Sequence, residues 1–173
     1  RVMGFDLYGV NPKQNTNTPE ILKNKFEELD KNKHDDYFIA QDEYEHQNPG
    51  IYFRANVWGW RPIWEFICNV CDEILTEKDI QSGQFNDGHK ISKTKAIKIA
   101  NRIKELDKDN IIKDYEILTN EKVNAAKEYN ETWETAIEQD PSLRDWTDAY
   151  PFNRDLILKF ANFCEQSGGF TIC

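Results

Sequence analysis

Asp87 and His89 stand two residues apart in the run Asn-Asp-Gly-His, where a carboxylate and an imidazole could form an acid and base pair. A neighbouring carboxylate orients an imidazole and strengthens it as a base, which suits proton transfer near neutral pH. The same Asn-Asp-Gly run is typical of a turn that needs no chemistry. The pair therefore indicates either the site of a small enzyme, with or without a metal, or a plain turn.

Four cysteines offer the ligand type that tetrahedral zinc accepts. Cys68 and Cys71 form a Cys-x-x-Cys pair, and Cys164 and Cys173 complete a set of four sulfurs. A zinc ribbon carries a second short pair beside a glycine, whereas these distal cysteines are nine residues apart and both flanks have a helical pattern. We favour buried thiols on core-facing positions and expect no metal and no cofactor.

A second candidate metal site lies on an acidic stretch. Asp42 and His46 stand one helical turn apart with Glu45 beside them, and residues 34–36 add His-Asp-Asp one to two turns earlier. Carboxylate and imidazole ligands on one helix face suit a divalent cation. A solvated acidic helix face explains the same pattern, and we favour that interpretation.

Three tryptophans and an arginine form the strongest candidate for recognition. Trp58, Trp60, Arg61 and Trp64 lie within seven residues, in the run Trp-Gly-Trp-Arg-Pro-Ile-Trp. Trp and Arg are the residue types most enriched at binding hot spots. The alternative is that the tryptophans fill a core that is short of aliphatic side chains, and this interpretation carries the greater weight.

The composition narrows the class of protein. The chain has 173 residues and a formal net charge of -9, with 31% charged, 39% apolar and 13% aromatic residues. One domain suits this length, and so many aromatic residues exclude a disordered chain. An acidic protein is a poor nucleic-acid binder by overall charge. No apolar run approaches the length that spans a bilayer, and the beginning of the chain does not resemble a signal peptide, so we expect a cytoplasmic protein.

The two ends of the chain have the pattern of short strands. Residues 3–10 and 170–173 alternate apolar side chains with others and are bounded by glycines. Neither segment can bury its face or fill its hydrogen-bond ladder alone, so we expect the two to pair, with residues 51–55 as a third strand. Met3 is the sole methionine, and we interpret Arg1 and Val2 as residues added before the natural start.

The rest of the chain is expected to be mostly helical, with apolar positions at helical spacing between capping and breaking residues. Pro62 suits the first turn of one helix, and Ser92 the cap of another. Residues 76–90 and 145–151 have the pattern of loops. The expected helices cover residues 18–30, 35–47, 62–75, 92–106, 111–139 and 153–167.

Charge is unevenly distributed over two of these helices. Residues 92–108 hold six Lys and Arg against two Asp and Glu, whereas residues 109–150 hold four against eleven. We expect an antiparallel hairpin in which the basic and the acidic face lie together and neutralise each other. The basic helix is a minor candidate for nucleic-acid binding, because it lacks interleaved aromatic side chains.

Four segments at both ends and in the centre of the chain carry distinctive motifs: residues 3–12 (MGFDLYGVNP), 48–62 (NPGIYFRANVWGWRP), 85–89 (FNDGH) and 160–173 (FANFCEQSGGFTIC). These segments resemble a family of uncharacterised proteins found in bacteriophage, bacterial and marine metagenomic sequences. The resemblance carries no known activity and implies a phage or bacterial cytoplasmic setting. Some relatives carry a cysteine-rich insertion of CxxCxGxG type before the final helix, where this chain has a long helix, and this argues further against zinc.

These observations predict a single mainly α (α+β) domain, with a helical bundle, a long helical hairpin and a small terminal sheet. The leading function is an acidic, non-enzymatic accessory protein that binds a protein partner through Trp58, Trp60, Arg61 and Trp64. It would be a phage factor acting on a host protein or a mimic of nucleic acid. The alternative is a small, metal-dependent or metal-free enzyme with its site near Asp87 and His89.

Overall fold

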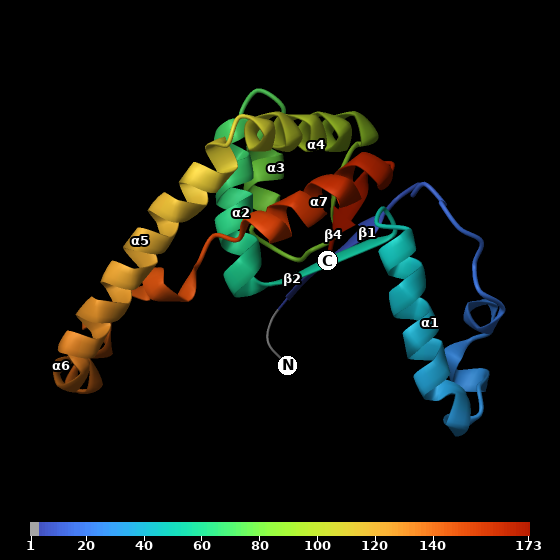
Figure 1. The fold of residues 1–173 in the computed structure, drawn as a ribbon, viewed down its shortest axis with the longest axis horizontal. Helices are drawn as coiled ribbons and strands as arrows, with labels where there is room; N and C mark the ends of the chain where they lie inside the picture. Colours follow the sequence, from blue (N-terminus) through green and yellow to red (C-terminus); the bar gives the residue numbers. More distant parts are fainter. Residues whose placement is uncertain (1–3) are drawn as a thin grey trace.

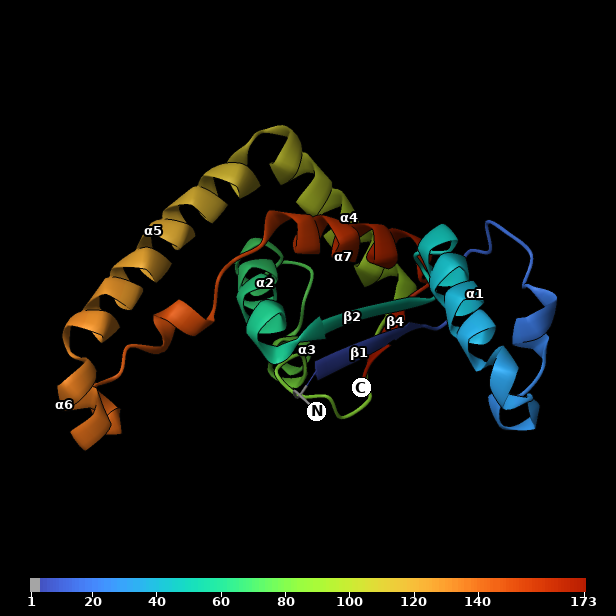
Figure 2. The same ribbon diagram turned by 60° about the horizontal axis from the view of Figure 1, so that its bottom comes forward.

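The chain folds into a central body from which two arms extend on opposite sides (Figures 1 and 2). The structure is a computed structural model that describes residues 4–173, so the expected start at Met3, and the residues before it, lie outside the described part. We call residues 20–47 the amino-terminal arm and residues 109–150 the long-helix arm. The remaining described residues form the body, which contains the sheet and most of the hydrophobic core.

The body is built on an antiparallel sheet of four strands within residues 4–173. The strands are β1 (Gly4–Gly9), β2 (Tyr52–Asn56), β3 (His89–Ile91) and β4 (Phe170–Ile172), in the spatial order β2-β1-β4-β3. The predicted pairing of the two chain ends is confirmed, as is the third strand. The mainly α class with a small terminal sheet is confirmed as well.

Helices cover one face of this sheet and leave the other open. The covered face carries the buried side chains of Phe5, Leu7, Phe53, Phe170 and Ile172. Two helices, α2 (Val57–Val70) and α7 (Arg154–Gln166), pack against it, and α4 (Lys93–Lys108) packs on the outer side of α7 (Figure 1). The core is therefore layered as sheet, inner helices and outer helix.

The expected start of a helix at Pro62 is wrong. Helix α2 begins at Val57, because the Asn56 side chain accepts a hydrogen bond from the Gly59 N–H at 2.8 Å and caps it. Pro62 lies inside the helix and removes only the bond that its own N–H would donate. The helix also ends at Val70, earlier than the expected residue 75.

The helix expected over residues 18–30 is not formed. Two short 3-10 helices stand there instead, η1 (Glu20–Lys23) and η2 (Phe26–Glu28), and a third, η3 (Lys31–Lys33), follows them. No residue in any of them is buried, and Phe26 packs on the partly exposed rings of His34, Tyr37 and Phe38, so the apolar spacing met no buried core against which a helix could pack. The next expected helix is confirmed as α1 (His34–Gln47).

The expected loop over residues 76–90 contains two elements. Helix α3 (Glu77–Ser82) begins with a capping box in which the Thr76 and Asp79 side chains each bond the other residue's backbone N–H. Strand β3 then pairs with β4 and completes the sheet. Both elements are too short to show a hydrophobic period, which is why the sequence indicated a loop.

The expected long helix and its hairpin partner diverge. Helix α5 (Ile111–Thr132) leaves α4 at a turn where Asn110 has a φ of 62°, and the chain then breaks at Trp133 before α6 (Glu134–Gln139). In both views α5 projects away from the body, so the hairpin is open. Within the described chain, the ion pairs of residues 92–108 go to Glu73, Asp79, Arg154 and Glu165 rather than to α5. The expected neutralisation between the two helices is therefore wrong.

Candidate functional site

The structure divides the tryptophan cluster into a buried part and a surface part. Trp60 and Trp64 are fully buried and stack on each other, with ring centroids 5.3 Å apart. Their Nε1–H groups donate to the carbonyls of Gly83 at 2.8 Å and Ile80 at 3.2 Å. A Cβ on Gly83 would stand 2.0 Å from the Trp64 ring, so glycine lets α3 lie against both indoles. These two tryptophans therefore contribute to the core.

Trp58 and Arg61 remain on the surface of α2. Trp58 is 38% exposed and packs against Tyr150, with ring centroids 4.9 Å apart. The Arg61 guanidinium lies 5.9 Å from the centre of the same ring and donates to the Tyr150 hydroxyl at 3.0 Å. Trp58, Arg61 and Tyr150 thus form one aromatic and cationic surface across 89 residues of sequence.

Arg61 and Tyr150 of this surface line a groove of about 710 Å³ between α2, α5 and the returning segment η5 (Trp146–Ala149), and Trp58 lies beside it. We call it the aromatic groove. Trp146, which is 55% exposed, lines it, and the Arg144 guanidinium lies 4.7 Å from the centre of the Trp146 ring. Its principal side chains are Arg61, Glu65, Tyr115, Lys122, Trp146 and Tyr150.

Hydrogen bonds fix the returning segment against α5. The Asn130 amide donates to the Asp145 carbonyl at 2.8 Å, and its oxygen accepts from the Asp145 N–H at 3.0 Å. The Asp145 carboxylate accepts from the Thr147 N–H at 2.9 Å, and this bonding lowers the pKa of Asp145. Arg154 binds Asp107 through two nitrogens, at 2.7 and 2.9 Å, where the chain re-enters the body. The wall of the aromatic groove is therefore already in place in the free protein.

Sequence reasoning missed Trp146 and Tyr150, because residues 145–151 read only as a loop. A tryptophan and a tyrosine within one short polar segment were the available signal, since large aromatic side chains in loops mark binding surfaces. What the sequence could not show is that this loop returns to α2.

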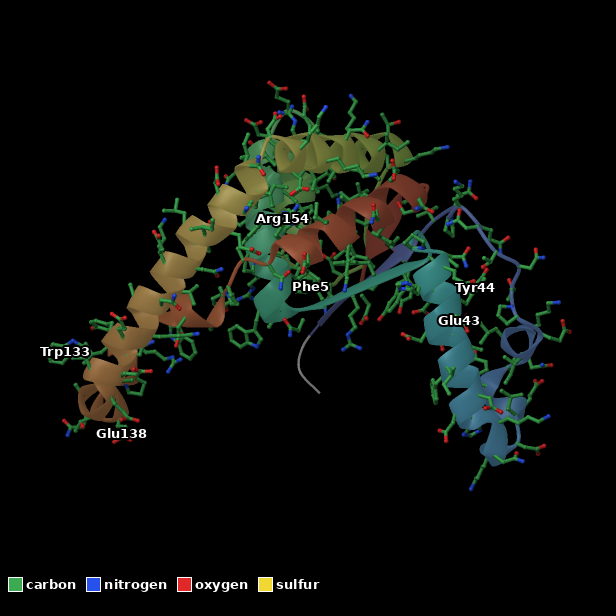
Figure 3. All side chains as sticks on the ribbon, viewed as in Figure 1. Phe5, Glu43, Tyr44, Trp133, Glu138 and Arg154 are labelled. Carbon is green, nitrogen blue, oxygen red and sulfur yellow. The ribbon has the colours of Figure 1, made fainter. Side chains whose placement is uncertain are left out.

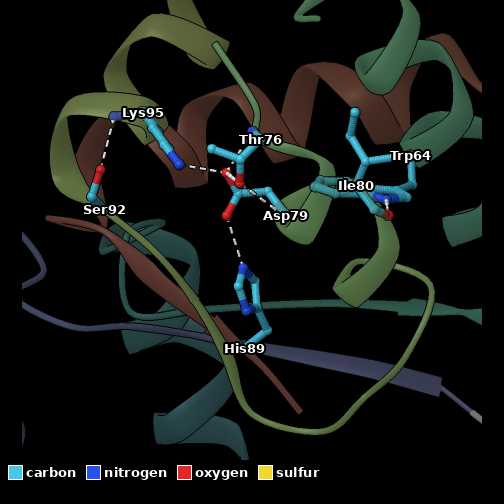
Figure 4. Close-up of polar contacts among 7 residues, drawn as sticks. All are labelled: Trp64, Thr76, Asp79, Ile80, His89, Ser92 and Lys95. Atoms are coloured by element: carbon cyan, nitrogen blue, oxygen red, sulfur yellow. Dashed lines mark hydrogen bonds and ion pairs between the residues drawn. The ribbon is translucent and has the colours of Figure 1, made fainter.

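The carboxylate that meets His89 is Asp79, not Asp87. His89 Nε2 lies 2.9 Å from Asp79 Oδ1, and Lys95 pairs with Asp79 Oδ2 (Figure 4). Thr76 adds hydrogen bonds from its N–H and its hydroxyl, each 2.9 Å long. Asp79 therefore joins α3, β3 and α4 at one point, whereas Asp87 is an exposed residue of the preceding turn.

The Asp79 carboxylate is fully engaged in these contacts. Burial alone raises its pKa, but the bonds from Lys95, Thr76 and His89 outweigh burial and hold the pKa well below its usual range. Oδ1 accepts one bond, from His89, and Oδ2 accepts three, from Lys95 and Thr76. The arrangement is suited to fixing three elements together.

The cysteines have the properties of core thiols. Burial raises the pKa of Cys68 to about 12 and that of Cys71 to about 11, and it also raises the pKa of Cys164. Cys173 is exposed at the end of β4. Residues 4–173 contain no group of three or more His, Cys, Asp and Glu side chains placed to hold a metal ion. Asp42, Glu45 and His46 lie instead along a second groove beside β2.

Comparison with known proteins gave no match to a family model, to a curated protein or to a solved structure. None of the helices within residues 4–173 is both long and apolar enough to cross a membrane.

Proposed function

We propose that this is a non-enzymatic accessory protein that binds a segment of a partner protein in the aromatic groove. The observation that carries the proposal is that Arg61, Tyr150 and Trp146 line one groove, with Trp58 packed against Tyr150 beside it. Trp, Tyr and Arg are the side chains that dominate binding energy at protein interfaces. Their fixed wall lowers the entropy that binding must overcome.

The partner segment is expected to be basic. The long-helix arm carries four Lys and Arg against eleven Asp and Glu. In the aromatic groove itself Glu65 and Asp145 stand against Arg61 and Lys122, so the acidic excess comes from the surrounding arm. Arg144 stacks on Trp146 from outside the groove, and this contact supports a preference of the indole ring for a guanidinium. A Lys or Arg of the partner would gain both from the carboxylates and from the aromatic rings.

A matched pair of tryptophan variants tests this proposal. Trp146 and Trp133 are exposed to nearly the same extent, 55% and 53%, but Trp146 lies in the aromatic groove and Trp133 at the far end of the arm. Quantitative capture from a bacterial lysate, with bound proteins identified by mass spectrometry, should recover a partner with wild type and with Trp133→Ala. Trp146→Ala should weaken that binding about tenfold or more.

The proposal fails if Trp146→Ala retains the same partner at wild-type affinity, or if both variants lose it equally. Arg61→Ala provides a second variant within the groove, and it should also weaken binding because it removes the cation over Tyr150. Thermal melting of each variant separates loss of binding from loss of fold.

A mimic of nucleic acid is the second candidate, and the two acidic arms favour it. The amino-terminal arm carries four Lys and Arg against nine Asp and Glu, so both arms are strongly negative. A partner that normally binds nucleic acid would be released by salt. Raising ionic strength from about 0.01 M to about 1 M cuts the Debye length from about 30 Å to about 3 Å, so capture should be lost.

The proposed setting is the cytoplasm of a bacterial or phage-infected cell, as the resemblance of residues 3–12 and 160–173 implies. An enzyme near Asp87 and His89 has less support, because Asp87 does not pair with His89, the His89 side chain is mostly buried, and neither groove is lined by these two residues.

A further inference from the structure

Strand β2 is an edge strand with a free row of backbone groups. The Gly9 N–H donates to the Ile51 carbonyl, and the register places Leu7 opposite Phe53 and Phe5 opposite Ala55. Hydrogen-bonded pairs alternate along an antiparallel ladder, so these are the bonded pairs. The N–H and C=O groups of Tyr52 and Arg54 consequently point away from β1.

The opposite side of β1 confirms this assignment. Asp6 exchanges both backbone hydrogen bonds with Cys173 on the β4 side, at 2.8 Å each. Even-numbered residues of β1 therefore bond towards β4 and odd-numbered residues towards β2. Among the described residues, no hydrogen bond outside the sheet engages the backbone N–H of Tyr52 or of Arg54.

A groove of about 450 Å³ runs beside this free edge, between β2, α7 and α1. We call it the edge groove. Helix α1 contributes Asp42, Glu45 and His46, and α7 contributes Leu156, Lys159 and Phe163. No residue of α1 is buried, so this helix stands beside the body and leaves the edge open. Helix α1, which lines the edge groove, and α5, which lines the aromatic groove, lie on opposite sides of the body (Figure 1).

Natural proteins usually protect an open edge with Pro, with a bulge, with an inward charge or with a covering element. Strand β2 has the sequence Tyr-Phe-Arg-Ala-Asn, without Pro, and pairs with β1 in continuous register. The Arg54 guanidinium does not shield the edge, because it lies 3.6 Å from Asp6 on the open face of the sheet. An accessible edge beside a groove is the geometry used for strand addition.

We propose that an extended segment of a partner protein adds to β2 as a fifth strand and occupies the edge groove. Its side chains alternate in direction, so every second one faces the apolar floor formed by Phe53, Leu156 and Phe163. Asp42 and Glu45 stand along the α1 wall and select a basic residue of the segment at that wall, whereas Arg54 and Lys159 line the other sides of the groove. This site is separate from the aromatic groove and does not depend on the function proposed for it.

A proline substitution tests the strand without disturbing the sheet. The Arg54 N–H points outward, so Arg54→Pro removes one edge donor and no bond to β1, which is where edge strands tolerate proline. Arg54→Ala is the matched control, because it removes the same side chain and its contact with Asp6 but keeps the N–H. Circular dichroism and thermal melting of the two variants show that both are folded.

The probe is a display library of random peptides of about ten residues, the upper range of strand length, selected on the wild-type protein. Bound peptides are eluted with a competing basic peptide of alternating Val and Lys. The affinity of each eluted peptide for wild type and for the two variants is then measured by fluorescence anisotropy. We expect selected peptides to bind wild type and Arg54→Ala equally, and to bind Arg54→Pro about tenfold more weakly, which equals about 1.4 kcal/mol. Their binding should also slow hydrogen exchange of the Tyr52 and Arg54 amides.

Three outcomes would overturn the proposal. The first is that the selection yields no binder, and the second is that every binder keeps its affinity for Arg54→Pro. The third is that wild type is a dimer and Arg54→Pro a monomer by analytical ultracentrifugation, since a second copy of this chain would then occupy the edge.

Discussion

The body and the two arms of this protein are built in different ways. The body buries a continuous core between the sheet and three helices, whereas the described arms bury only Ile112, Val123 and Ala126. Charge follows the same division, because both arms are strongly acidic and the rest of the chain carries fourteen Lys and Arg against eleven Asp and Glu. We infer that most of the free energy of folding comes from contacts within the body. The arms expose a large surface and contribute little to stability.

The arms also differ from each other. The long-helix arm is braced by its returning segment through Asn130 and Asp145, and its exposed Trp133 and Glu138 mark the far end (Figure 3). The amino-terminal arm is fixed to the body at its base, where Asn48 is fully buried and bonds Asn15 and Thr16. We therefore expect the long-helix arm to hold its shape better than the amino-terminal arm.

The largest expected effect of a single substitution is in the body. Trp60→Ala should lower the free energy of unfolding by about 3–5 kcal/mol, because it opens a cavity beneath the sheet. It also leaves the Gly83 carbonyl without its donor. Trp133→Ala, on the arm, should change stability by less than about 0.5 kcal/mol. Urea denaturation of both variants measures the contrast, and equal losses would abolish the division between body and arm.

The next effect is at the point where Asp79 joins α3, β3 and α4. Asp79→Asn should cost about 1.5–3 kcal/mol at neutral pH, because it weakens hydrogen bonds to a charged group. Asp87→Asn is the matched control, since Asp87 is exposed in the neighbouring turn, and it should have almost no effect. Chemical denaturation of the two variants decides whether the ionised Asp79 contributes as stated.

The contribution of Asp79 should depend on pH. Its pKa in the folded state lies below that in the unfolded state, so the stabilisation is fully present above about pH 4 and decreases as the pH falls further. The difference in stability between wild type and Asp79→Asn should therefore shrink below about pH 4. A difference that stays constant down to pH 2 would show that ionisation is not the source.

Asn48→Ala should loosen the amino-terminal arm. The substitution removes the side chain that binds the Asn15 and Thr16 N–H groups, at 2.7 and 3.2 Å, and the Tyr44 carbonyl at 2.7 Å, at a cost of about 1–3 kcal/mol. Hydrogen exchange should accelerate in α1 more than in α2 or α7. Equal acceleration throughout the chain would mean that this arm is part of the cooperative core.

The smallest expected effect is in the long-helix arm. Asn130→Ala removes two hydrogen bonds to the Asp145 backbone at a part-exposed site, which should cost about 0.5–1.5 kcal/mol. Proteolysis between residues 140 and 150 should become faster while the melting temperature of the body changes little. Unchanged cleavage would show that Asn130 does not hold the wall of the aromatic groove.

Elements with strong local sequence patterns were predicted correctly. Elements whose formation depends on contacts with distant parts of the chain were not. The paired chain ends and the start of α4 after Ser92 followed from alternation and capping. Residues 18–30 had apolar spacing but no buried core to pack against, so that pattern did not give a helix. Strand β3 consists of three residues and exists only because β4 lies beside it.

The candidate site was predicted in part. Trp58 and Arg61 are at the surface, whereas Trp60 and Trp64 belong to the core, a distinction that depends on which side of α2 meets α3. The Tyr150 contact spans 89 residues and the Asp79 contact with Lys95 spans 16, so neither leaves a local motif. Contacts between residues this far apart in the chain cannot be predicted from the composition or from the spacing of residues.

Native-state hydrogen exchange tests the division between body and arms most directly. We predict that amides of β1, α2 and α7 exchange only through global unfolding, that α5 opens at a lower free energy, and that α1 opens at the lowest. Amides of α1 that are as protected as those of α7 would contradict this account.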